Sequence, residues 1–126
     1  MTVAAAHFIP TLLFQRGRKP LGEIAASRMQ QAERALAAIE TISGPVVLCG
    51  DFNAPPTAAP VRLLASRLRD AWEERGIGFG WTEPAALPRA RIDYVFVRDL
   101  IVGDVDVGCG ACDASDHLPV VATVVP

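Results

Sequence analysis

The chain has 126 residues, about the size of one domain, and its net charge is −2. This charge and a pI near 5.6 argue against a nucleic-acid binder held mainly by a large basic surface. Hydrophobic residues make up 51% of the chain, but no run approaches the roughly 20 apolar residues of a membrane helix. We therefore predict buried strands and no membrane span. The N-terminus lacks a basic, apolar leader, which predicts a cytoplasmic protein.

The first half of the chain predicts a strand, a helix and a second strand. Residues 2–6 form a short apolar run that ends at His7, and residues 8–22 have the prolines, glycines and basic residues of a surface loop. Apolar residues recur at three- and four-residue spacing in residues 23–42, which indicates an amphipathic helix. The short, β-branched run at residues 46–49 is typical of a buried strand, and it leads directly into Gly50-Asp51-Phe52-Asn53.

The second half predicts one helix and three strands. The helix covers residues 58–68, and a Gly- and Pro-rich loop follows at residues 75–87. The strands cover residues 91–97, 100–107 and 119–125. In the first of them, Asp93 shares a face with Val95, whereas Tyr94 and Phe96 share the other face. Strands that are apolar on both faces need cover on both sides, and the order of elements predicts an α/β domain.

Two segments beside predicted strands carry side chains that could bind a cation or a phosphate or transfer a proton. Alternation places Asp51 and Asn53 on one side at the end of a strand, with Phe52 turned into the core. The carboxylate can hold a hard cation or orient a water, and the amide can donate to a phosphate oxygen. His117 lies between Asp116 and the last strand, where it can bind phosphate or transfer a proton. The simpler alternatives are an Asp/Asn turn and a structural loop histidine.

A third candidate is Asp93, a carboxylate inside an otherwise apolar strand. A buried carboxylate is costly unless it is paired, and His117 is the natural partner. Such a pair would fix the tautomer of the imidazole and raise its basicity. Pairing of Asp93 with Arg91 or with a backbone amide is the alternative.

Cys109-Gly-Ala-Cys112 has the spacing of a zinc or redox site. Zinc would need two further ligands, and only His117 is nearby in the sequence. A redox pair normally lies at the start of a helix, whereas this one follows a predicted strand within a Gly-rich loop. We interpret the segment as a loop with incidental thiols, and a thiol-redox protein remains an alternative.

The motifs GDFN, RIDYVFV and SDHLPV, in this order, resemble those of the endonuclease/exonuclease/phosphatase superfamily, with its deoxyribonuclease I-like fold. His7 after a short strand, and Trp81-Thr82 before the second motif, extend the resemblance over essentially the whole of residues 1–126. It is similar to the C-terminal half of that fold only. The resemblance implies half of a two-sheet α/β sandwich, with one mixed sheet and helices on one face.

The resemblance also implies a function, namely hydrolysis of a phosphoester or phosphodiester by water with Mg²⁺ or Mn²⁺. In its terms, Asp51 and Asn53 orient the water and contact the phosphate, Asp93 and His117 form a pair, and His7 binds phosphate or serves the leaving group. Asp116 lies close to the metal or phosphate, and Asp51 is the other candidate metal ligand. The substrate is a phosphoester, either a small molecule or a nucleic acid.

Family members are longer, and their N-terminal half contributes a glutamate that binds the metal. The alternative is therefore a non-catalytic, truncated module that packs with a partner chain. We expect an apolar sheet face, formed by residues 46–49, 91–97 and 119–125, to be buried against a second copy or a complementing N-terminal half.

Overall fold

A computed structural model describes residues 1–11, 20–108 and 114–126 of the chain. Six strands and three helices occur there: β1 (Thr2–His7), α1 (Leu21–Glu40), β2 (Val46–Asp51), α2 (Ala59–Ala65), β3 (Arg69–Asp70), α3 (Ala71–Arg75), β4 (Asp93–Arg98), β5 (Ile101–Val107) and β6 (Val120–Val125). The α/β class predicted from the sequence is confirmed. No helix in the described ranges has the length and apolar character needed to cross a membrane.

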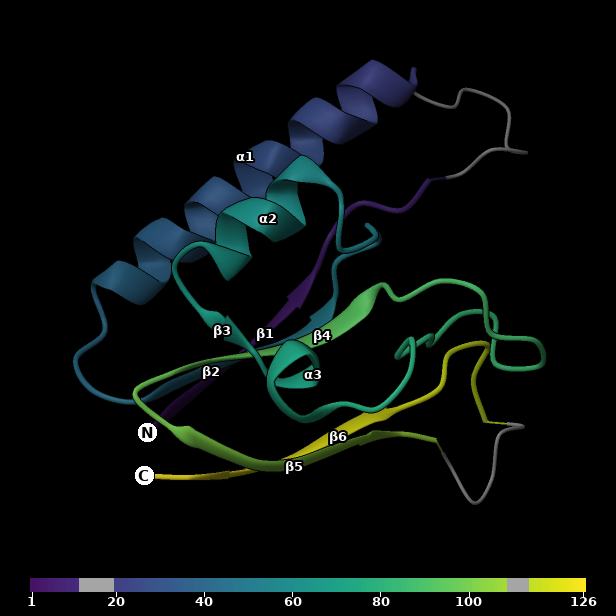
Figure 1. Ribbon diagram of the computed structural model, residues 1–126. Coiled ribbons are helices and arrows are strands. Elements are labelled where there is room, and N and C mark those ends of the chain that lie inside the picture. Colours follow the sequence, from purple (N-terminus) through teal and green to yellow (C-terminus); the bar gives the residue numbers. More distant parts are fainter. Residues whose placement is uncertain (12–19, 109–113) are drawn as a thin grey trace.

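The strands form two sheets (Figure 1). The larger sheet has the order β1-β2-β4-β3, in which β1 and β2 are parallel and the other pairs are antiparallel. β5 and β6 form a separate antiparallel pair. The expectation that residues 119–125 share one sheet with residues 46–49 and 91–97 is therefore wrong.

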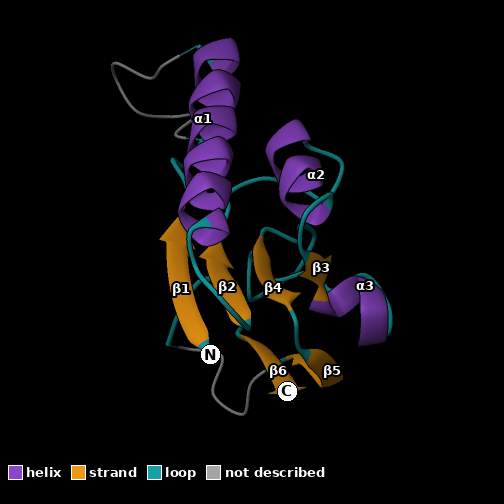
Figure 2. Cartoon of the chain, turned by 90° about the vertical axis from the view of Figure 1, so that its left-hand side faces the viewer, coloured by secondary structure: helices purple, strands orange, loops and turns teal. Residues whose placement is uncertain are grey.

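One apolar core lies between the four-stranded sheet and the helices α1 and α2. α1 contributes Leu36 and α2 contributes Leu64, and both pack against inward side chains of β2 and β4. Phe52 is fully buried at the centre, with edge-on contacts to Phe8 (4.7 Å between ring centroids) and Phe96 (5.6 Å). Figure 2 shows α1 and α2 together on this side of the sheet.

A second apolar core lies on the opposite face of the sheet. Val47 of β2 and Val97 of β4 point to this side, because strand residues alternate between faces. Val102 and Val105 of β5 pack against them, and side chains of β6 complete the cluster. The predicted bare face is thus partly covered by the β5–β6 pair. The large apolar side chains that remain exposed on the strands are Val3, Ile101, Val121 and Val125.

Two elements, β3 and α3, were not predicted. They contain two and five residues, which is too short for a hydrophobic period to show. Asp70 begins α3 as its N-cap, because its Oδ1 accepts a hydrogen bond from the Trp72 backbone N–H at 2.9 Å. Asp70 also pairs with the buried guanidinium of Arg91, and this ties α3 to the segment that enters β4.

Candidate active site

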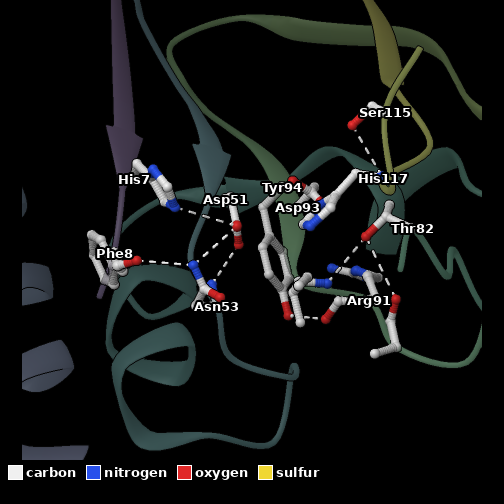
Figure 3. A network of polar contacts seen from close by, with 12 residues as sticks. His7, Phe8, Asp51, Asn53, Thr82, Arg91, Asp93, Tyr94, Ser115 and His117 are labelled. Atoms are coloured by element: carbon white, nitrogen blue, oxygen red, sulfur yellow. Dashed lines mark hydrogen bonds and ion pairs between the residues drawn. The ribbon is translucent and has the colours of Figure 1, made fainter. Parts of the chain in front are cut away.

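The candidate residues meet where β1 and β2 end and β4 begins (Figure 3). The strand registers explain this, since His7 is opposite Asp51 across the β1–β2 ladder and Asp51 is opposite Asp93 across the β2–β4 ladder. Three polar side chains therefore form one row across the sheet. His117 joins this row from the segment before β6, which belongs to the other sheet.

The turn after β2 holds Asp51 in place. Asp51 accepts hydrogen bonds from the backbone N–H of Asn53 at 2.7 Å and from its side-chain amide at 2.9 Å. The same amide nitrogen donates to the Phe8 carbonyl at 2.9 Å. Both amide hydrogens of Asn53 are thus engaged, so donation to a phosphate would have to replace one of these bonds. Asn53 has a φ of 50°, a left-handed conformation that asparagine tolerates better than most residues.

Asp93 and His117 form the pair expected from the sequence. The Nδ1 atom of His117 lies 2.8 Å from an Asp93 carboxylate oxygen, and both side chains are half-buried. This bond leaves Nε2 as the free nitrogen of the ring. Arg91, the alternative partner of Asp93, instead bonds Asp70 and Glu73. The pairing of Asp93 is therefore with the imidazole.

The electrostatics of the row favour a proton on His117 and disfavour charge on Asp51. Burial raises the pKa of Asp51, and the nearby Asp93 carboxylate raises it further. Burial lowers the pKa of His117, but the hydrogen bond and charge of Asp93, with the charges of Asp51 and Asp116, outweigh burial and raise that pKa overall. The Asp93 carboxylate contributes to both shifts, because it repels the charge on Asp51 and attracts the charge on His117.

His7 and Asp116 lie at the exposed margin of the site. The Nε2 atom of His7 lies 3.6 Å from Asp51 Oδ2, and most of the His7 side chain is exposed. Asp116 is exposed, and its backbone carbonyl accepts a hydrogen bond from the Ala85 N–H at 2.6 Å. Within residues 1–11, 20–108 and 114–126, Asp51, Asp93 and His117 have ligand atoms that all lie within 4.8 Å of one another, close enough to share a metal ion. Asp116 as a metal ligand stays a prediction.

Residues outside the motifs hold the site together. Arg28 of α1 donates to the Ile9 carbonyl at 2.8 Å and to the Thr11 hydroxyl at 2.6 Å, and Gln31 accepts from the Ile9 N–H at 3.0 Å. These bonds fix the segment that follows His7. The sequence predicts only that Arg28 lies within the helix at residues 23–42, because hydrogen bonds to a distant backbone leave no pattern in the sequence.

The loop before β4 supports the other side of the site. Thr82 is fully buried, and its carbonyl accepts a hydrogen bond from the Leu118 N–H at 2.7 Å, next to His117. Its hydroxyl accepts from the Ile92 N–H at 3.3 Å, next to Asp93. Thr82 thereby joins the two segments that carry the pair. Cys109 and Cys112, the alternative redox or zinc residues, lie outside the described residues.

Solved structures similar to this chain come from several organisms. An endonuclease/exonuclease/phosphatase from Bacteroides vulgatus has a TM-score of 0.69 at 23% identity, over 79% of this chain and 44% of that one. The human Nocturnin catalytic domain has a TM-score of 0.66 at 22% identity, over 97% of this chain and 46% of that one. A humanized D. rerio TDP2 has a TM-score of 0.72 at 19% identity, over 98% of this chain and 55% of that one. The chain thus spans about half the length of these structures, and the likeness concerns the fold.

No curated protein sequence matches the chain significantly. The model of the Endonuclease/Exonuclease/phosphatase family does match, from residue 8 to residue 117. The match includes the GDFN turn, the strand that carries Asp93 and the segment that ends at His117. The chain belongs to the Endonuclease/Exonuclease/phosphatase family.

Proposed function

We propose that this site serves the hydrolysis of a phosphoester, most simply a phosphodiester, with a divalent cation. The observation that carries the proposal is the Asp93–His117 pair at 2.8 Å, with Asp51 close to both partners. Transfer of a phosphoryl group depends on positioning and on neutralising charge more than on a protein nucleophile. The row offers an imidazole that can donate to the phosphate, and its carboxylates can hold the cation that would neutralise charge.

The acidic groups fit a hard cation, which we propose to be Mg²⁺ or Mn²⁺. Such ions bind carboxylate oxygens, and Asp51 offers one beside the Asp93–His117 pair. A positive charge nearby would offset the repulsion between the Asp51 and Asp93 carboxylates. Asp51 and Asp116 are the proposed ligands, which leaves Asp93 paired with His117. When bound, the cation would neutralise phosphate charge and acidify a coordinated water.

The side chains then have separate roles. Asp51 orients the attacking water beside the cation. Asn53 fixes the orientation of Asp51 through the two bonds described above. His117, whose pKa is raised by its bond to Asp93, donates in its protonated form from Nε2 to a phosphate oxygen. His7 lies at the open side of Asp51, where it can give a proton to the leaving group.

The first experiment measures cation binding by the fold. A cation that binds the native state at ten times its Kd stabilises it by about 1.4 kcal/mol, which thermal unfolding resolves. Mg²⁺ or Mn²⁺ should raise the Tm of the wild type, and Asp51→Asn should remove the increase. Asp104→Asn, a matched change at an exposed position of β5, should keep it. An equal rise in all three proteins would disprove binding at Asp51.

The second experiment measures hydrolysis of bis(4-nitrophenyl) phosphate. With a complementing N-terminal half supplied, turnover should depend on Mn²⁺ or Mg²⁺ and stop in EDTA. His117→Ala should reduce it by about 10²–10⁴-fold, the usual contribution of acid–base groups. Equal turnover in EDTA would eliminate the metal mechanism.

A non-catalytic module that packs with a partner is the second candidate function. The chain spans only 44–55% of the similar structures described above. β6 pairs with β5 alone among the described strands, and Val121 and Val125 on it are exposed and uncharged. A strand edge of this kind can accept a further strand, from a complementing N-terminal half or from a second copy. Sedimentation combined with the cation titration distinguishes the candidates, because a purely structural module would associate but bind no cation.

A further inference from the structure

Arg91 carries a buried donor that its neighbours leave unused. The side chain is 4% exposed, and its terminal nitrogens bond the carboxylates of Asp70 and Glu73. The guanidinium also lies 4.7 Å from the centroid of the Tyr94 ring. Among the described residues, Arg91 Nε is the buried side-chain nitrogen or oxygen without a hydrogen-bond partner. The other contacts hold the guanidinium in place, so this donor needs a partner that comes to it.

A small pocket beside Arg91 also reaches Asp93. It lies where the second apolar core meets the candidate site, between β4, α3 and the β5–β6 pair. Arg91, Asp70 and Asp93 form its charged walls. Its apolar walls include Val95, Val107 and Val120. The centre of a water molecule has about 10 Å³ of room there, which is close to what one water needs. The pocket therefore has space for one water and for no larger ligand.

The chemistry of the pocket also selects water. The Nε–H of Arg91 can only donate a hydrogen bond, and the ionised carboxylate of Asp93 can only accept one. Asp93 uses Oδ2 for His117, at 2.8 Å, which leaves Oδ1 to accept from another donor. A cation in the pocket would be repelled by the guanidinium, and an anion would be repelled by the carboxylates. A water can accept from one group and donate to the other.

We propose that one water binds in this pocket, accepts a hydrogen bond from Arg91 Nε–H and donates one to Asp93 Oδ1. Arg91 is then a positioning residue for the Asp93–His117 pair, because it acts through the water and the carboxylate. A carboxylate held at Oδ1 presents Oδ2 to the imidazole in one orientation, and this keeps the proton on Nδ1 and leaves Nε2 for the substrate. The role in the reaction rests on the proposed function, whereas the water site does not.

Crystal structures of the wild type and of two matched variants test the water site. Val107→Ile adds a methyl group, about the size of a water, to the wall of the pocket. Val121→Ile is the control, because Val121 is 61% exposed on β6 and lies one rung along the same ladder. The wild type and the control should hold a water within hydrogen-bonding distance of Arg91 Nε and Asp93, and Val107→Ile should lack it. A wild-type pocket without this water, or a water that contacts only one of the two groups, would overturn the proposal.

NMR of His117 tests whether the water positions Asp93. The Nδ1–H proton, held in its bond to Asp93, should give a downfield signal that exchanges slowly with solvent. Val107→Ile should move this signal upfield and speed its exchange by about fivefold, the effect of one lost hydrogen bond. Val121→Ile should leave both unchanged. If Val107→Ile loses the water and the His117 signal stays the same, Arg91 does not position the pair and the proposal is wrong.

Arg91→Lys tests the donor itself. Lysine keeps a positive charge for Asp70 but has no Nε–H, so the His117 signal should change as it does in Val107→Ile. An unchanged signal in a folded Arg91→Lys protein would contradict the role of Nε. Should this variant not fold, Val107→Ile still decides, because it keeps the bond between Arg91 and Asp70.

These measurements use neither a cation nor a substrate. A protein that shows the water and the His117 changes but hydrolyses no phosphoester would refute the proposed function and support the water site. A wild-type pocket without the water would overturn this inference and leave the proposed function standing.

Discussion

Replacing Gly50 with alanine should destabilise the protein by about 3–5 kcal/mol, because a side chain there would collide with the backbone of β1. Its φ of 141° belongs to a region that essentially only glycine adopts, and forcing a side chain there costs about 1–3 kcal/mol. The new Cβ would also lie 1.9 Å from the Ala6 carbonyl oxygen. The strands must separate by roughly 1 Å to relieve this contact, which weakens about two backbone hydrogen bonds of about 1 kcal/mol each.

Denaturant unfolding measures this change, and Gly22→Ala is the control. Gly22 lies in the first turn of α1, and nothing within 4 Å of its position would contact a new Cβ. Alanine there should be neutral or stabilise by up to about 1 kcal/mol. Gly50→Ala should also perturb the imidazole signal of His7, because His7 follows Ala6 on the displaced strand. Equal stability of Gly50→Ala and the wild type would refute the close approach of the two strands.

Three further outcomes are expected. Asp93→Asn should lower the pKa of His117, because the substitution removes the charge and the hydrogen bond that raise this pKa. NMR titration of the two histidines measures the change, and an unchanged pKa would disprove the pairing. The pKa of His117 is raised in the folded state. The protonated imidazole therefore contributes its full stabilisation below the unfolded-state pKa of 6.5, and this contribution is lost as the pH rises through the folded-state pKa. The unfolding free energy should therefore fall more steeply above pH 6.5 in the wild type than in His117→Gln, and parallel curves would contradict the linkage. Phe52→Ala should cost about 3–5 kcal/mol in denaturant unfolding, whereas exposed Phe79→Ala should change stability by about 0.5 kcal/mol or less.

The elements that the sequence predicted well are those with a clear hydrophobic period. The predicted helix at residues 23–42 and the observed α1, Leu21–Glu40, differ by two residues at each end. The alternation in β4 also predicted its two faces correctly, since Tyr94 joins the helix-side core and Val97 joins the opposite one. Periodicity describes how one element is buried and says nothing about which strand lies beside it. The division of the strands into two sheets was therefore missed.

The site shows the same division between local and long-range information. The residue types at Asp51, Asn53 and His117 were identified because each stands beside a predicted strand end. The row formed by His7, Asp51 and Asp93 depends on the registers of two ladders, which are set by pairing between distant segments. The bonds from Arg28 and Thr82 to the backbone depend on tertiary packing in the same way. Their side chains carry no periodic signal from which this role could be predicted.

The charges of Asp51, Asp93 and His117 bear on whether the site needs a cation and whether this chain alone can hold one. Asp51 and Asp93 stand opposite each other on neighbouring strands, and a phosphate brought to His117 would add further negative charge beside them. One imidazolium cannot offset two carboxylates and a phosphate, so a cation is the natural means of bringing the substrate in. Asp51 and Asp116 supply few ligands for an ion that prefers about six oxygens. Similar structures are about twice as long as this chain, and we expect their additional half to be the source of the ligands that complete such a site. Cation affinity in this chain alone should then be weak, and it should rise when a complementing half is added.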